Sequence, residues 1–119
     1  MSVRSDFYVI VGYDLTGCET EKYEDWEYTD EGEKYHCNQF KDKIQFFNDP
    51  MSGNYLYFGY ILAEGEVYEF ETTKFDVDDI YEAKVKVQDE LNKLIKLGVI
   101  QKDAHIKRDC HVIAFEEIS

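Results

Sequence analysis

Residues 76–98 read DVDDIYEAKVKVQDELNKLIKLG and predict one long amphipathic helix over about 77–97. Asp76 suits the N-cap position, and Asp79, three residues later, can act as the second member of a capping box. Gly98 suits the position just past the last helical residue. Apolar residues recur at helical spacing along one face of this helix. They are Ile80, Val87, Leu91, Leu94 and Ile95.

The segments around this helix read as strands. Residues 7–15 (FYVIVGYDL) and 55–62 (YLYFGYIL) are apolar on both faces, which is typical of central strands. Gly59 indicates a bulge or a close approach of the backbone, and Glu64-Gly65 reads as a turn. Three further strands are predicted: 43–47, 66–72 and 110–115.

The segment that follows the first strand is ambiguous between helix and strand. Tyr23 and Trp26 are three residues apart, as on a helix face, whereas Trp26 and Tyr28 are two apart, as on a strand. Gly32 can supply the positive φ of a short hairpin loop. We therefore expect a hairpin of two strands, 23–29 and 33–38.

A series of strands, one long helix and a final strand indicates an α+β domain. We expect a mostly antiparallel sheet of about five to seven strands with the helix on one face. No linker or repeat divides the sequence, so residues 1–119 are predicted to form a single domain. Because one helix covers only one face, the other face should be partly exposed and aromatic, or covered by residues 19–38.

The net charge of −13 is concentrated in two acidic stretches. Residues 14–33 contain nine acids and one base, and residues 64–79 contain seven acids and one base. The opposite sign prevails in residues 84–108, whose net charge is +4. Binding to nucleic acid or to an anionic membrane needs positive charge at the contact, so the acidic balance disfavours both.

Aromatic residues are interleaved with these acids. Tyr and Trp among carboxylates suit recognition of a surface rich in Arg and Lys. We expect the two acidic stretches to come together beside Trp26 in one patch, with Tyr23 and Tyr28 as further anchors; a merely solubilising surface is the alternative. The predicted partner-binding residues are Glu21, Glu24, Asp25, Trp26, Glu27, Tyr28, Asp30, Glu31, Glu69 and Glu71.

The sequence contains no motif for catalysis, phosphate binding or metal binding, so no catalytic residue, cofactor or metal is predicted. Cys18, Cys37 and Cys110 lack the paired spacing of a zinc module, and their odd count indicates free thiols in a reducing cytoplasm. The first residues do not form a signal peptide, and no apolar run is long enough to span a membrane.

The stretches FYVIVGYDLTG at 7–17 and NDPMSGNYLYFGYIL at 48–62 resemble those of small acidic proteins of tailed phages of Gram-positive bacteria. Such proteins often bind and disable host proteins, including nucleic-acid-acting defence machinery. The resemblance therefore implies a role in host takeover or anti-defence, in the cytoplasm of the host cell.

We therefore expect a non-enzymatic protein that binds and inhibits a basic, nucleic-acid-handling host protein, with carboxylates acting as a nucleic-acid mimic. One alternative is a small phage enzyme or ligand-binding protein acting on a nucleotide, with a pocket near residues 48–54 or near His105 and His111. Another is a structural or assembly protein that forms homo-oligomers through the aromatic sheet face. The basic residues 84–108 could also meet an acidic patch of a second copy.

Overall fold

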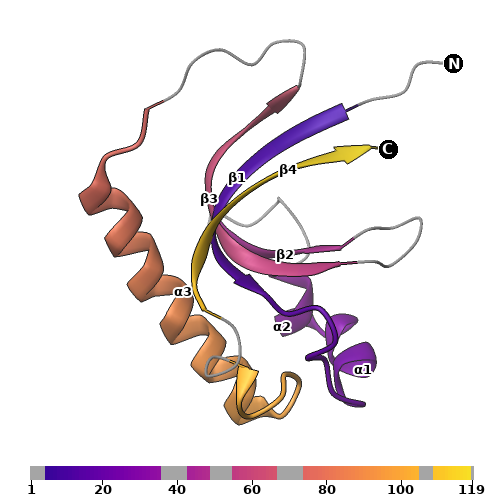
Figure 1. Cartoon of the computed structure of the whole chain (residues 1–119). Helices are drawn as coiled ribbons and strands as arrows, with labels where there is room; N and C mark the ends of the chain where they lie inside the picture. The colour runs from indigo at the N-terminus through magenta and orange to yellow at the C-terminus, as the bar shows by residue number, and fades with distance from the viewer. Residues whose placement is uncertain (1–4, 36–42, 49–54, 67–73, 105–108, 119) are drawn as a thin grey trace, which may run out of the picture.

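The computed structural model describes residues 5–35, 43–48, 55–66, 74–104 and 109–118. These residues form a four-stranded antiparallel sheet with one long helix packed on it, followed by a last strand (Figure 1). The predicted α+β class is therefore confirmed. The elements in chain order are β1 (Ser5–Asp14), α1 (Tyr23–Glu27), α2 (Asp30–Glu33), β2 (Ile44–Asn48), β3 (Leu56–Glu66), α3 (Val77–Leu97) and β4 (His111–Ile118).

The strands lie in the order β2-β3-β1-β4, and each neighbouring pair is antiparallel. β1 and β3 each have a strand on both sides, which confirms them as central strands. Their apolar residues on both faces follow from this position, because each face of a central strand meets other side chains. β2 and β4 form the edges of the sheet within the described residues.

β1 and β3 approach each other closely where Gly12 pairs with Gly59. A Cβ atom added to Gly12 would lie 2.0 Å from the carbonyl oxygen of Phe58, and one added to Gly59 would lie 2.6 Å from the carbonyl oxygen of Val11. This confirms the close backbone approach predicted at Gly59. The bulge in this strand pair lies elsewhere, where the register shifts between Val9 and Ile10.

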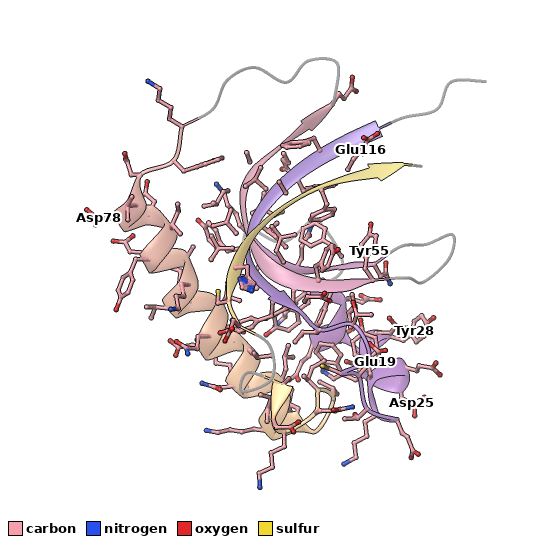
Figure 2. The ribbon with its side chains drawn as sticks, in the orientation of Figure 1. Glu19, Asp25, Tyr28, Tyr55, Asp78 and Glu116 are labelled. Atoms are coloured by element: carbon pink, nitrogen blue, oxygen red, sulfur yellow. The ribbon has the colours of Figure 1, made fainter. Side chains whose placement is uncertain are left out.

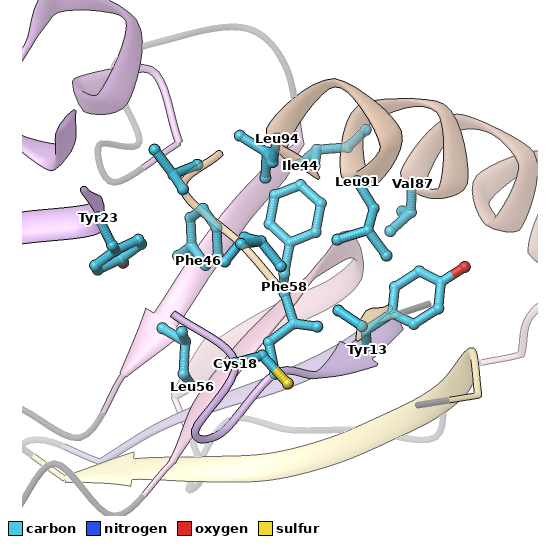
Figure 3. Packing of buried hydrophobic residues seen from close by; sticks show 14 of the residues in the cluster. Tyr13, Cys18, Tyr23, Ile44, Phe46, Leu56, Phe58, Val87, Leu91 and Leu94 are labelled. Atoms are coloured by element: carbon cyan, nitrogen blue, oxygen red, sulfur yellow. The ribbon is translucent and has the colours of Figure 1, made fainter. Parts of the chain in front are cut away.

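α3 covers one face of the sheet and packs on β1 and β3. The helix has the predicted bounds, and Gly98 adopts the left-handed conformation (φ 81°) expected after its last residue. Asp76 occupies the N-cap position but its side chain makes no capping hydrogen bond, so the predicted capping box is wrong. Figure 3 shows the core beneath the helix, which includes Tyr13, Phe46, Leu56, Phe58, Val87, Leu91 and Leu94.

The other face of the sheet is aromatic and partly exposed, as predicted. The rings of Phe47 on β2 and Phe115 on β4 have centroids 5.3 Å apart. In a flat sheet these strands would lie about 14 Å apart, because three strand spacings separate them. The sheet is therefore strongly curled, and α3 lies on the outer side of the curve (Figure 1). The aromatic rings pack on the opposite face of the sheet.

The predicted hairpin of residues 23–29 and 33–38 is wrong where the structure describes it. Two short helices replace it. Thr29 is the N-cap of the second helix, and its side-chain oxygen accepts a hydrogen bond from the Gly32 backbone N–H at 3.1 Å. Gly32 lies in this helix against the backbone of α1, where an added Cβ would be 2.1 Å from the carbonyl oxygen of Trp26. Its small size serves close packing, not a hairpin turn. Residues 36–38 lie outside the described residues.

The turn predicted at Glu64-Gly65 is also wrong, because β3 continues through these residues to Glu66. Pairing with β1 explains the extension, since Glu64, Gly65 and Glu66 all have partners in the ladder. The strand predicted over residues 66–72 otherwise lies outside the described residues. The sheet therefore has four described strands where about five to seven were expected.

Candidate functional site

Residues 19–33 form a compact acidic corner at one end of the molecule. Thr20 fixes this corner to the C-terminal end of α3, because its backbone N–H donates to the Val99 carbonyl at 3.0 Å and its hydroxyl donates to the Gly98 carbonyl. Seven acids of the corner are exposed. They are Glu19, Glu21, Glu24, Asp25, Asp30, Glu31 and Glu33.

Part of this acidity has a local structural role. Glu24 and Asp25 lie in the first turn of α1, and Asp30 and Glu31 lie in the first turn of α2. Negative side chains are favoured there by the positive end of the helix dipole. For these four acids the structure shows no ion pair within the described residues. Their charge is therefore presented to solvent.

Tyr28 is the exposed aromatic residue of the acidic corner, at 80% exposure. It lies between the two short helices, and Figure 2 shows its side chain pointing outward on the same side as Asp25. An exposed Tyr among carboxylates combines apolar area with a hydrogen-bonding tip, which suits a contact with Arg or Lys side chains.

Trp26 is not a surface anchor, contrary to the prediction. It is 9% exposed and belongs to the core together with Tyr23. Both rings pack against Phe46 of β2, with centroid distances of 6.1 Å for Trp26 and 5.6 Å for Tyr23. The spacing of three residues between Tyr23 and Trp26 was the correct signal, because it puts both rings on the buried face of α1.

The second acidic stretch does not join the corner, so the predicted single patch is wrong for the acids that the structure describes. Glu66 pairs with Asp6 at one end of β1, whereas the corner follows Asp14 at the other end, about 26 Å along the strand. Asp78 lies in the first turn of α3, and the corner contacts the opposite end of that helix, about 30 Å away (Figure 2). Glu69 and Glu71 lie outside the described residues.

A groove lined by lysines runs between α3 and the β2 side of the sheet. Its central cavity of about 760 Å³ continues into two cavities of about 450 Å³ each, with which it shares lining residues. The sequence indicated excess positive charge in residues 84–108, but not that lysines from other segments would face it. Five lysines line the central cavity: Lys34, Lys43, Lys86, Lys93 and Lys96.

One polar contact joins a tyrosine hydroxyl to a cysteine thiol. The Tyr13 hydroxyl and the Cys110 thiol are hydrogen-bonded, and burial raises the pKa of both groups, that of Tyr13 to about 12. Burial and the nearby carboxylates of Glu27 and Glu19 raise the pKa of Tyr23. The described residues hold no cluster of three or more side chains able to ligate a metal.

Other candidate groups are dispersed or outside the described residues. Cys18 is buried in the core, where it packs as a small apolar side chain. His111 is exposed at the start of β4. Cys37, His105 and most of the 48–54 segment lie outside the described residues. The pocket predicted near residues 48–54 or near His105 and His111 therefore stays a prediction, and the described residues Asn48, Tyr55 and His111 do not line the three cavities of the groove.

Comparison with protein-family models, with curated proteins and with solved structures gives no match. Among the described helices, none is both long and apolar enough to cross a membrane.

Proposed function

We propose that this protein is a non-enzymatic interaction protein that binds a basic protein partner through its acidic corner. The observation that carries the proposal is the exposure of Tyr28 between two short helices that are anchored in the core and that carry five of the seven exposed acids of the corner. A surface needed only for solubility would not require an exposed aromatic side chain among its acids.

Because the two short helices are anchored in the core, few backbone groups must become ordered when a partner binds. Trp26 and Tyr23 hold α1 in the core, and Thr29 caps α2 directly behind it. The backbone that carries the acids is therefore fixed before a partner arrives, which lowers the entropic cost of binding. Long-range attraction between the corner and a basic surface would also accelerate association at low salt.

The proposed mechanism is competition with nucleic acid. Carboxylates of the corner would occupy the positions of phosphates on a nucleic-acid-handling protein, whose Lys and Arg side chains would then be unavailable to their own ligand. The resemblance to small phage proteins suggests that this partner belongs to a bacterial host. Tyr28 replaces Trp26 as the expected central anchor of the contact.

A pair of charge variants tests the proposal. The corner variant carries Glu24→Gln, Asp25→Asn, Asp30→Asn and Glu31→Gln. The control variant removes the same number of exposed acids from the other stretch, at Glu64, Glu66, Asp78 and Asp79. Each protein is immobilised, exposed to bacterial lysate, and eluted with increasing salt; captured proteins are identified by mass spectrometry.

We expect the wild type and the control variant to capture the same basic protein and the corner variant to lose it. Tyr28→Ala should weaken this capture by about 2 kcal/mol, as expected for a central aromatic anchor. Elution should occur at moderate salt, because the contact is electrostatic. Equal capture by the corner variant, or loss with the control variant alone, would contradict the proposal.

A further inference from the structure

The lysine groove is a continuous feature of the surface that the acidic corner does not explain. Tyr60, Lys43 and Lys86 line both the central cavity and the cavity toward the start of α3. Tyr35 and Lys93 line both the central cavity and the cavity toward the end of α3. The three cavities therefore form one groove along the length of the helix.

Lysines face each other across this groove. Lys86, Lys93 and Lys96 are spaced seven and three residues apart, so they lie on one face of α3. Lys34, at the end of α2, and Lys43, just before β2, belong to the opposite wall. Five of the thirteen bases of the chain thus gather at one place in a protein of net charge −13. Such mutual repulsion is relieved by an anion between the walls.

The acids of the central cavity do not cancel the charge of its five lysines, whereas the outer cavities add the acids Asp76, Asp79, Glu82 and Glu31 and the base Lys74. Asp89 and Glu90 are the acids that line the central cavity. Glu90 accepts hydrogen bonds from the Tyr35 hydroxyl at 2.6 Å and from the Lys93 ammonium at 3.0 Å. Glu90 therefore links the two walls, and the central cavity keeps a net charge of +3.

The walls also offer aromatic surface. Tyr60 and Tyr35 are half-buried in the groove, and the Lys86 ammonium lies over the Tyr60 ring, 5.7 Å from its centroid. A ring with a cation beside it can receive a planar base and direct a phosphate to the lysines at the same time. A volume of about 760 Å³ lies within the range of small-molecule sites.

We infer that the lysine groove binds a nucleoside polyphosphate. Several lysines on two walls match the charge of a chain of phosphates, and the tyrosines provide a surface for the base. A long nucleic acid fits less well, because the rest of this acidic protein would repel the parts that extend beyond the groove.

The experiment is calorimetric titration of the full chain at about 0.15 M salt with adenosine triphosphate, inorganic tripolyphosphate and adenosine. The groove variant is Lys93→Gln with Lys96→Gln. Its matched control is Lys84→Gln with Lys102→Gln, two exposed lysines that do not line the three cavities. A third variant, Tyr60→Leu, removes the proposed surface for the base.

We expect saturable binding of adenosine triphosphate that the groove variant weakens at least about tenfold, because each lysine lost removes a charged hydrogen bond. The control variant should bind like the wild type, and so should Glu24→Gln with Asp25→Asn and Asp30→Asn, three corner acids that do not line the three cavities. The latter result separates this site from the proposed function. Tyr60→Leu should remove any preference for adenosine triphosphate over tripolyphosphate.

Three results would overturn the inference. The first is the absence of saturable binding by adenosine triphosphate. The second is equal binding by the wild type and the groove variant. The third is self-association of the wild type at low salt that the groove variant abolishes without any binding of the phosphate probes, because the groove would then seat the acidic corner of a second copy.

Discussion

Trp26 and Tyr28 are two residues apart but have opposite environments. The indole of Trp26 packs among Tyr23, Tyr35 and Phe46, whereas the Tyr28 side chain is 80% exposed. The helical backbone of α1 and its end at Glu27 cause this difference, because residues 23 and 26 share its buried face and residue 28 lies beyond its last turn. Trp26 thus contributes to the core, whereas Tyr28 is accessible for the proposed contact with a partner.

Substitution at these two positions should separate the two roles. We expect Trp26→Ala to lower the free energy of unfolding by about 3–5 kcal/mol, since it removes a large buried side chain. Tyr28→Ala should change it by no more than about 0.5 kcal/mol. Urea denaturation of both variants measures this. A Trp26→Ala protein as stable as the wild type would show that α1 is not anchored through this ring.

Tyr13 predicts a loss of stability at alkaline pH. Its pKa is raised to about 12 by burial and by Cys110, so the folded state favours the neutral phenol more than the unfolded state does. The resulting stability is complete below pH about 10 and is lost as the pH rises toward about 12. Tyr23, whose pKa is raised by burial and by nearby carboxylates, acts in the same direction.

Urea midpoints measured from pH about 9 to about 12, together with the ultraviolet absorbance of tyrosinate, test this dependence. Tyr13→Phe removes one of the two buried phenols and should make the midpoint fall less steeply with pH. An equally steep fall in Tyr13→Phe would mean that Tyr13 does not contribute to the effect.

The pairing of Gly12 with Gly59 allows the two central strands to approach each other closely. Their lack of side chains lets β1 and β3 approach where Phe58 and Tyr13 enter the core beneath α3. The curl brings the rings of Tyr8, Phe47 and Phe115 together on the other face.

Gly12→Ala should therefore be strongly destabilising, by about 1–3 kcal/mol or more, because the new methyl group meets backbone atoms of β3 that have no room to move. The matched control is Gly65→Ala in the same strand pair. A Cβ at Gly65 meets nothing within 4 Å, so this change should be neutral or slightly stabilising. Thermal unfolding of both variants provides the comparison, and equal effects would contradict the close-approach argument.

At the scale of the whole molecule, charge is sorted by position. The acidic corner lies at the end where α3 finishes, Asp78 and Asp79 lie where α3 begins, and the lysine groove runs between these ends. Carboxylates within each acidic region repel one another, whereas the lysines of the groove and the acids beside it attract each other. The balance is repulsive, because the net charge is −13.

Raising the salt concentration from about 0.01 M to about 0.15 M should therefore stabilise the folded protein, since screening weakens repulsion between exposed carboxylates. The corner variant should show a smaller gain, because it lacks four of those charges. Thermal unfolding at a series of sodium chloride concentrations measures both effects. A melting temperature that falls with salt would show that attractive pairs dominate.

Elements whose pattern is local and repeated could be predicted from the amino-acid sequence. The helical spacing over 77–97 predicted α3, and the two-faced apolar runs predicted β1 and β3 as central strands, because a long periodic pattern allows one conformation to bury its apolar residues. The positions of Gly98 and Asp76 at the ends of α3 also followed from local backbone preferences.

The conformation of the short segments, and the arrangement of segments distant in the sequence, depend on tertiary packing. Residues 23–33 are too short for their pattern to choose between helix and strand, and contact of Trp26 with Phe46 settles the choice. The separation of the two acidic stretches follows from the direction of β1 and the length of α3. The lysine groove exists because residues 34, 43 and 86–96 meet in space, and sequence spacing carries no signal of that meeting.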